Sequence, residues 1–196
     1  MFLGEPFGGV LPGGRGAVLA VLLRTGEPLT GRQVHGLLSD EHSLWSVQES
    51  LRAWVRLGIV EARSVGRATL HTVNGAHAAV ASLRLLADPV ALLTGVVGEW
   101  VDPAVGAVIL YGSTARGEAR PDSDIDLAVI ASSAWDRRVE LQEAVRAGIG
   151  NDCDVLVFTP GRFRRLVASG EPVVTDILRD GIALIGSVPR VRRGVA

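Results

Sequence analysis

The sequence contains no lysine, because all 20 of its basic residues are arginines. A catalytic lysine is therefore excluded. The chain also has only one cysteine, Cys153, which excludes a disulfide framework and is typical of a protein from a reducing compartment. We interpret Cys153 as a small buried hydrophobic residue rather than a nucleophile.

Long hydrophobic runs are absent too. No apolar run approaches the ~18 residues of a membrane span, and no basic segment precedes an apolar one as in a signal peptide. We therefore expect a cytoplasmic, soluble protein that does not enter a membrane. The length of 196 residues, with 47% hydrophobic and 21% charged residues, allows one large or two small globular domains.

The first part of the chain predicts helices followed by a hairpin. Residues 1–12 are rich in Gly and Pro, and we expect them to form a loose arm. Helices are predicted from Arg15, after an N-cap at Thr30 and after an N-cap at Ser43. Two strand-like runs then flank Gly66. This order resembles a winged helix-turn-helix domain, which with a linker helix would occupy residues 1–87.

The charge of this first domain does not decide what the domain binds. Arg52, Arg56, Arg63 and Arg67 on the recognition helix and wing could contact DNA phosphates. Residues 1–75 nevertheless hold seven Arg against six acidic residues, far from a strongly basic footprint. A docking or homodimerisation unit is the alternative. We interpret Trp45 and Trp54 as core or interface residues, and the four histidines as structural: His35, His42, His71 and His77.

The most informative stretch runs from residue 111 to residue 130, between two apolar runs that predict strands. Asp124 and Asp126 are two positions apart, so on a strand they project from the same side. Two like charges on one side favour a bound cation, and Mg²⁺ is commonly held by one or two carboxylates together with substrate phosphates. Gly112 lets the backbone approach a phosphate, Ser113 adds a hydroxyl, and Arg116 adds a guanidinium suited to phosphate oxygens. This pattern predicts a site for a nucleoside triphosphate with metal.

Gly112-Ser113, ten intervening residues and Asp124-x-Asp126 resemble the signature of the DNA polymerase beta-like nucleotidyltransferase superfamily, and especially its minimal branch. The resemblance covers about residues 104 to 160. It implies a small mixed-sheet α/β domain, for which we expect residues 88–196, within an α+β protein. A crossover helix over residues 135–147 and two further helices after Phe158 are predicted, and the tail that carries Arg190 is expected to be mobile.

The resemblance also implies a third carboxylate on a later strand. Asp154, directly before an apolar run, matches that position best, and Asp152 is the fallback. Asp124, Asp126 and Asp154 would then be both catalytic residues and ligands of two Mg²⁺ ions. The residues expected to contact the nucleotide, with ATP as the expected NTP, are Gly112, Ser113, Arg116 and Ser123.

Three functions remain open at this stage. The chain could transfer a nucleoside monophosphate to a partner protein, as antitoxins of the minimal branch do to a toxin. It could instead modify a small molecule, as aminoglycoside nucleotidyltransferases do. The third option is a DNA-binding regulator in which the NTP is only sensed. Three intact carboxylates argue against the third option, and a winged helix argues against the second.

Overall fold

The computed structural model describes residues 1–38, 42–120 and 122–189. These fall into two compact units, one made of residues 5–89 and the other of residues 1–4 and 90–196. The predicted tail around Arg190 lies outside the described residues. Among the described residues no single helix is long and apolar enough to cross a membrane, although the helices α4 (Val80–Leu86) and α5 (Pro89–Gly98) reach that length and composition together.

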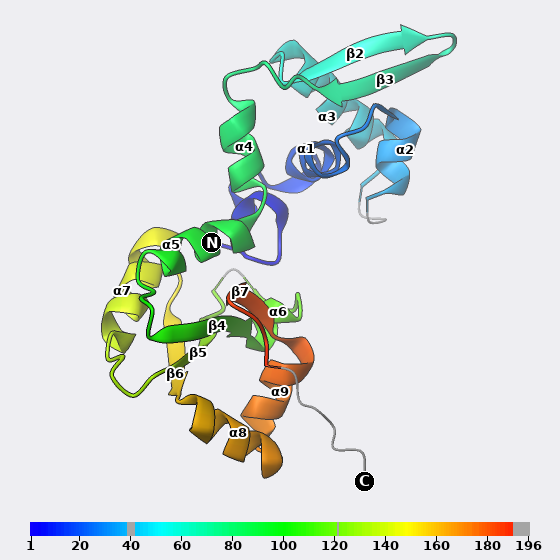
Figure 1. The fold of residues 1–196 in the computed structure, drawn as a ribbon. Coiled ribbons are helices and arrows are strands. Elements are labelled where there is room, and N and C mark those ends of the chain that lie inside the picture. Colours follow the sequence, from blue (N-terminus) through cyan, green and yellow to red (C-terminus); the bar gives the residue numbers. More distant parts are fainter. Residues whose placement is uncertain (39–41, 121, 190–196) are drawn as a thin grey trace. The chain divides into compact units, whose positions relative to one another are not determined.

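The N-terminal unit combines short helices with a three-stranded antiparallel sheet of order β1-β3-β2 (Figure 1). Strands β2 and β3 form a hairpin that turns at Gly66, where φ is +59°. The elements are η1 (Pro6–Gly9), α1 (Gly13–Thr25), β1 (Leu29–Thr30), α2 (Gly31–Gly36), α3 (Leu44–Arg56), β2 (Val60–Val65), β3 (Ala68–Val73) and α4 (Val80–Leu86).

Local sequence explains where these helices begin and end. Thr30 and Gln33 form a capping box on α2, and the Ser43 side chain accepts a hydrogen bond from the Ser46 N–H at the start of α3. Helix α1 ends at Gly26 in the left-handed conformation. The two predicted N-caps are therefore confirmed.

Two tryptophans of α3 have different environments. Trp54 is buried and donates its indole N–H to the Arg15 carbonyl at 3.0 Å. Trp45 is 70% exposed, so within this chain it is not a core residue. Of the two tryptophans of α3, Trp54 therefore packs in the core and Trp45 does not.

The expectation of a loose N-terminal arm is wrong. Phe7 is fully buried in the core of the N-terminal unit, and Leu3 is buried in the core of the C-terminal unit. The Met1 amino group donates hydrogen bonds to the Ile149 carbonyl and to Asn151 Oδ1. Gly and Pro content suggested a loop, but the apolar residues between them supply the anchoring contacts.

The C-terminal unit is built on a four-stranded mixed sheet of order β6-β5-β4-β7. Only the β5–β6 pair is parallel, and helix α7 makes the crossover between these two strands. The elements are α5 (Pro89–Gly98), β4 (Val105–Tyr111), α6 (Gly112–Ala115), β5 (Ile125–Ala131), α7 (Arg138–Ile149), β6 (Cys153–Phe158), α8 (Pro160–Ala168), α9 (Pro172–Asp180) and β7 (Ile182–Ile185).

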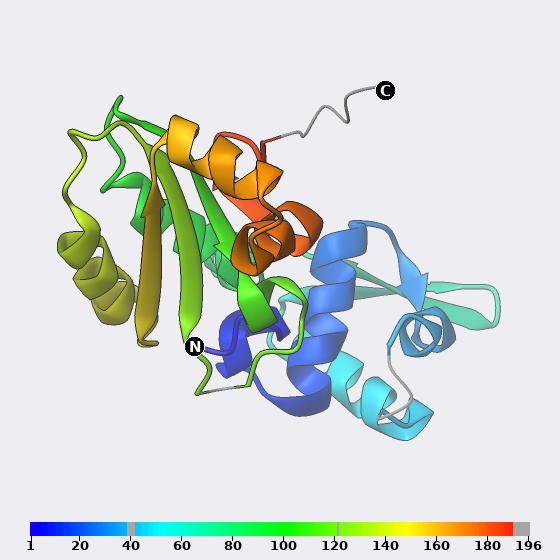
Figure 2. The same ribbon diagram turned by 90° about the horizontal axis from the view of Figure 1, so that it is seen from below.

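The two faces of this sheet pack against different helices, as Figure 2 shows for α7 and for the pair α8 and α9. Alternate residues of the central strand divide between them: Ile125 and Leu127 pack with α5 and α7, whereas Ala128 and Ile130 pack with α8 and α9. Asp126 has the parity of Ala128. Its carboxylate therefore belongs to the face that α8 and α9 cover.

Candidate active site

Three polar side chains form a row across the sheet where β4 ends and β5 and β6 begin. Tyr111 on β4 is the register partner of Asp126 on β5, and Asp126 is the register partner of Asp154 on β6. Register partners on neighbouring strands point to the same face. Asp124 stands two positions before Asp126, directly ahead of β5. The structure thus brings the three predicted carboxylates to one end of the sheet.

Gly112 is required at its position for two reasons. Its φ is +73°, which L side chains rarely adopt, and a Cβ there would lie 2.1 Å from Asp126 Oδ2. The backbone that follows β4 therefore runs directly against the carboxylate. Ser113, the next residue, is half-buried, and its hydroxyl makes no hydrogen bond within the described part of the chain. That hydroxyl is available to a ligand.

The carboxylates repel one another. Burial raises the pKa of Asp126 above its ordinary value, and the neighbouring charges of Asp154 and Asp124 raise it further, while Arg116 opposes them. Asp124 and Asp154 themselves are exposed. A cation bound among these groups would remove the repulsion.

Two ionisable groups next to the carboxylates, Tyr111 and Cys153, stay neutral at neutral pH. Burial and then the charges of Asp126 and Asp154 raise the pKa of Tyr111 to about 12. Burial, followed by the carboxylates with Asp154 first, raises the pKa of the Cys153 thiol to about 12. A thiol with such a pKa is a poor nucleophile at neutral pH. The structure therefore agrees with the interpretation of Cys153 as unreactive.

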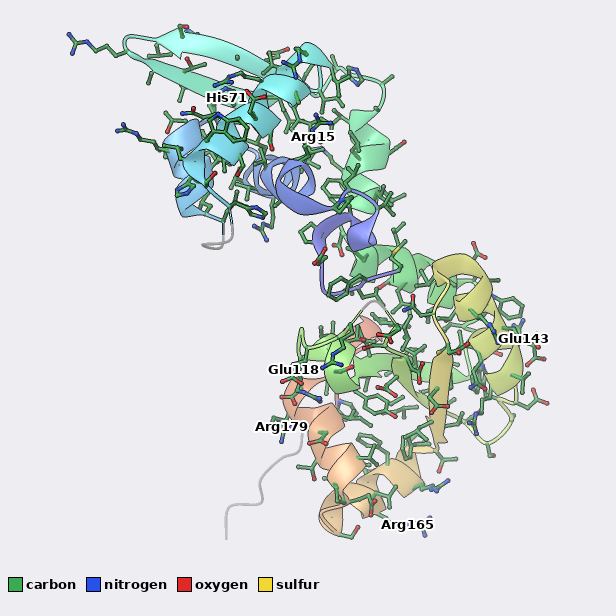
Figure 3. The ribbon with its side chains drawn as sticks, turned by 180° about the vertical axis from the view of Figure 1, so that it is seen from behind. Arg15, His71, Glu118, Glu143, Arg165 and Arg179 are labelled. Carbon is green, nitrogen blue, oxygen red and sulfur yellow. The ribbon has the colours of Figure 1, made fainter. Side chains whose placement is uncertain are left out.

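Arg116 is not free in this structure. Its Nε lies 2.7 Å from Glu118 Oε2, and the charges of Asp180 and Asp176 on α9 also act on it. Arg179 in turn forms ion pairs with both aspartates of α9. Figure 3 shows Glu118 and Arg179 on neighbouring segments. Only Nε is engaged in this pair, so the Nη groups of Arg116 could contact a phosphate while Glu118 stays bound.

Ser123 is engaged in the turn that precedes Asp124. Its Oγ accepts a hydrogen bond from the Arg120 N–H at 2.8 Å, and its carbonyl accepts one from Asn151 Nδ2 at 3.0 Å. Asn151 is buried, and its hydrogen bond to the Ser123 carbonyl connects the turn before Asp124 to the start of β6. The sequence reasoning missed Asn151. The signal was present, because a polar amide directly before a buried strand needs hydrogen-bond partners.

The structure separates the two candidates for the third carboxylate. Asp154 lies beside Asp126 in register, whereas Asp152 precedes β6 and lies 3.4 Å from Arg146 Nε. Arg146 belongs to α7, which covers the opposite face of the sheet. Geometry therefore favours Asp154.

The donor atoms suit magnesium, since carboxylate oxygens are the ligand type that Mg²⁺ prefers. No three Asp, Glu, His or Cys side chains within residues 1–38, 42–120 and 122–189 are already grouped to hold a metal ion. Asp126 and Asp154 are neighbours, and Asp124 is exposed just outside the strand. The residues fit a cation held by carboxylates with phosphate oxygens and water completing its coordination, rather than a closed protein cage.

Residues 101–176, which carry the whole row, match the protein family described as Polymerase beta, Nucleotidyltransferase. This part of the chain is a polymerase beta nucleotidyltransferase domain. The sequence prediction of such a domain is thereby confirmed, whereas the winged-helix identity of the N-terminal unit stays a prediction. No curated protein matches the sequence.

Solved structures resemble about half of the chain. One is described as a crystal structure of a toxin-antitoxin with AMP-PNP; it is 24% identical over 48% of this chain and 73% of that chain, with a TM-score of 0.37. Another contains tri-AMPylated Shewanella oneidensis HEPN toxin in complex with MNT antitoxin; it is 21% identical over 50% of this chain and 73% of that chain, with a TM-score of 0.34.

Proposed function

We propose that the nucleotidyltransferase domain moves a nucleoside monophosphate from an NTP, expected to be ATP, to a hydroxyl acceptor and releases pyrophosphate. The observation that carries this proposal is the register pairing of Asp126 with Asp154 beside Gly112, where no side chain fits. The arrangement provides a concentrated negative charge next to backbone that a phosphate can approach closely.

The chain's own residues would hold the triphosphate in the following way. Gly112 keeps the approach open, and the free Ser113 hydroxyl donates to a phosphate oxygen. Ser123 Oγ already accepts one hydrogen bond, so its O–H remains as a donor. Arg116 adds the Nη groups of its guanidinium, which Glu118 does not engage.

The chemistry is an in-line displacement at the α-phosphorus. The acceptor oxygen forms a bond to this phosphorus, the bond to the bridging oxygen breaks, and the electron pair leaves with pyrophosphate. In this proposal Asp154 takes the proton of the acceptor hydroxyl. Two Mg²⁺ ions held by Asp124, Asp126 and Asp154 would, when bound, stabilise the charge that develops on the phosphates.

We propose that a partner protein supplies the acceptor hydroxyl, as a toxin does for the antitoxins of the minimal nucleotidyltransferase branch. Asp124 and Asp154 are exposed at the strand ends, so a Tyr, Ser or Thr on another folded protein can reach them. Asp126, the more enclosed carboxylate, lies between Asp154 and the Gly112 backbone. This arrangement suits an acceptor that is presented from outside.

The N-terminal unit has the element order proposed for a winged helix, with three helices, a short strand and a hairpin. Of the four arginines predicted to contact DNA, three face one groove. The fourth, Arg63, pairs in register with Leu70 and has the opposite parity from Ala62, which faces that groove. The four therefore do not form one patch, and DNA binding and homodimerisation stay predictions.

A labelling experiment tests the proposed function. The full chain is incubated with Mg²⁺ and α-³²P-labelled NTPs, in parallel with native lysate of the source organism and with aminoglycosides. We expect a labelled protein band that is absent with Asp126→Asn. Saturable labelling of an aminoglycoside without a labelled protein would overturn the protein acceptor and favour the small-molecule enzyme. Labelling of neither would contradict the transferase proposal itself.

A further inference from the structure

The N-terminal unit contains a groove of about 890 Å³ that none of the proposed transfer chemistry uses. It lies between α3, the inner face of the β2–β3 hairpin and the start of α2. Its volume falls within the range of small-molecule sites, roughly 300–1,000 Å³. The lining residues that matter here are Arg32, Arg52, Arg56, Arg67, Leu51 and His71.

Charge in this groove is of one sign. Four of the seven arginines in residues 1–75 line it, and they come from α2, α3 and the hairpin turn. None of the acidic residues that the structure describes in that range lines it. Arg52 is paired with Glu49. Arg32, Arg56 and Arg67 form no ion pair with any described carboxylate.

The groove also has an apolar floor. Leu51 and Val55 lie one helical turn apart on α3, and Ala62 faces them from the hairpin. Guanidinium groups around an apolar floor are complementary to a molecule that combines a flat apolar body with several negative charges.

His71 supplies a polar group inside the groove. It is the register partner of Ala62, and Figure 3 shows it on the side of the hairpin that faces the helices. Its Nδ1 is buried and has no hydrogen-bond partner among the described residues. Burial lowers the pKa of His71, while a hydrogen bond with the Leu29 backbone opposes this shift. An unpartnered buried nitrogen is unfavourable, and the exposed part of the imidazole ring lines the groove.

We propose that this groove binds a free nucleoside polyphosphate, with the phosphates on Arg32, Arg56 and Arg67 and the base on the apolar floor. A compact ligand with several charges meets arginines from three elements at once. A duplex has phosphates spread along a rod and would also recruit outward-facing arginines such as Arg63, which lies on the other face of the hairpin. This second nucleotide site is independent of the carboxylate row and of the proposed transfer reaction.

Calorimetric titration of the full chain tests the inference. The host is Asp126→Asn in EDTA, so that transfer and metal-dependent binding at the carboxylates are silenced. Titrants are ATP, GTP, inorganic tripolyphosphate, a single-stranded dT 12-mer and a 20-base-pair duplex. We expect ATP or GTP to bind, and to bind at least about tenfold more weakly after Arg56→Ala or Arg67→Ala, because each substitution removes a charge-assisted contact. Arg63→Ala is the matched control on the same hairpin and should leave binding unchanged.

Several results would overturn the inference. Absence of nucleotide binding, or binding that survives Arg56→Ala combined with Arg67→Ala, would remove the groove as a site. Equal affinity for tripolyphosphate would show that the floor does not recognise a base. Binding of the single strand or the duplex but not of free nucleotides would reassign the groove to nucleic acid. Circular dichroism of each variant confirms that it is folded, and Arg56→Gln repeats the test where the alanine variant is unstable.

Discussion

The two units of this chain gather charges of opposite sign. The C-terminal unit gathers carboxylates on paired strands, and the N-terminal unit gathers arginines from separate elements. In the C-terminal unit, carboxylates on neighbouring strands are forced together by the sheet register, and burial raises the pKa of Asp126. In the N-terminal unit, arginines from three elements surround an apolar groove, and three of the four form no ion pair with a carboxylate in the part of the chain that the structure describes. Strand pairing can hold like charges at a short distance, whereas long arginine side chains on separate elements can change their positions. The first arrangement suits a cation with reactive phosphates, and the second suits an anion that is only bound.

The strongest test of this comparison removes one charge from the row. Asp126→Asn should reduce the rate of nucleotide transfer by about 10²–10³, the usual loss when one group that stabilises a transition state is removed. Binding of ATP to the arginine groove should not change. Steady-state labelling and calorimetry on the same protein measure both quantities. Equal losses in both would mean that the two regions are not independent.

A pair of glycine variants sharpens the geometric claim. Gly112 and Gly117 both have positive φ, so alanine at either position costs about 1–2 kcal/mol of folding stability. Only at residue 112 does the new Cβ collide with Asp126, since nothing lies within 4 Å of a Cβ at residue 117. We expect Gly112→Ala to reduce transfer by about 10²-fold through displacement of the carboxylate, and Gly117→Ala to keep most of the activity. Similar activities in the two variants would contradict the close approach.

The raised pKa of Asp126 predicts a pH dependence of stability. The folded state binds the proton more tightly than the unfolded state, whose carboxyl has the ordinary pKa of 3.8. Without metal, the free energy of unfolding should therefore fall as the pH rises from about 3.8 through the folded-state pKa. In Asp126→Asn this decrease should disappear, and the variant should be the more stable protein at neutral pH. Urea unfolding in EDTA across this range measures the difference. A wild type that gains stability relative to Asp126→Asn over the same range would exclude the proposed repulsion.

The smallest effect is expected at the exposed pair of Arg146 and Asp152. Arg146→Ala should change the free energy of unfolding by less than about 1 kcal/mol, because exposed ion pairs contribute little. Transfer activity should stay near that of the wild type. A large loss of activity would indicate that the α7 side of the sheet takes part in the reaction.

The sequence alone predicts a site well when the residues of that site lie close together along the chain, and poorly when they are far apart. The carboxylate row lies within a short stretch with period-2 spacing, so Asp124 and Asp126 could be identified before the fold was known. The choice of Asp154 over Asp152 needed the β5–β6 register, and the pairing of Arg116 with Glu118 depends on a turn that no pattern specifies. These are long-range or irregular features.

The arginine groove could be predicted from the sequence only in part. Sequence grouped Arg63 with Arg67 because both belong to the hairpin, but their faces are decided by strand pairing and turn geometry. Arg32 was missed, since α2 contributes to the groove only through tertiary packing. Phe7 likewise anchors a segment that composition alone marked as loose.

The most direct test of the central claim compares the two aspartates around Cys153. The full chain, Asp154→Asn and Asp152→Asn are each incubated with Mg²⁺, α-³²P-labelled ATP and native lysate. Asp154→Asn should abolish incorporation of label into the acceptor, and Asp152→Asn should leave it nearly unchanged, because only Asp154 lies beside Asp126 in register. Label that persists in Asp154→Asn and is lost in Asp152→Asn would contradict the proposed site.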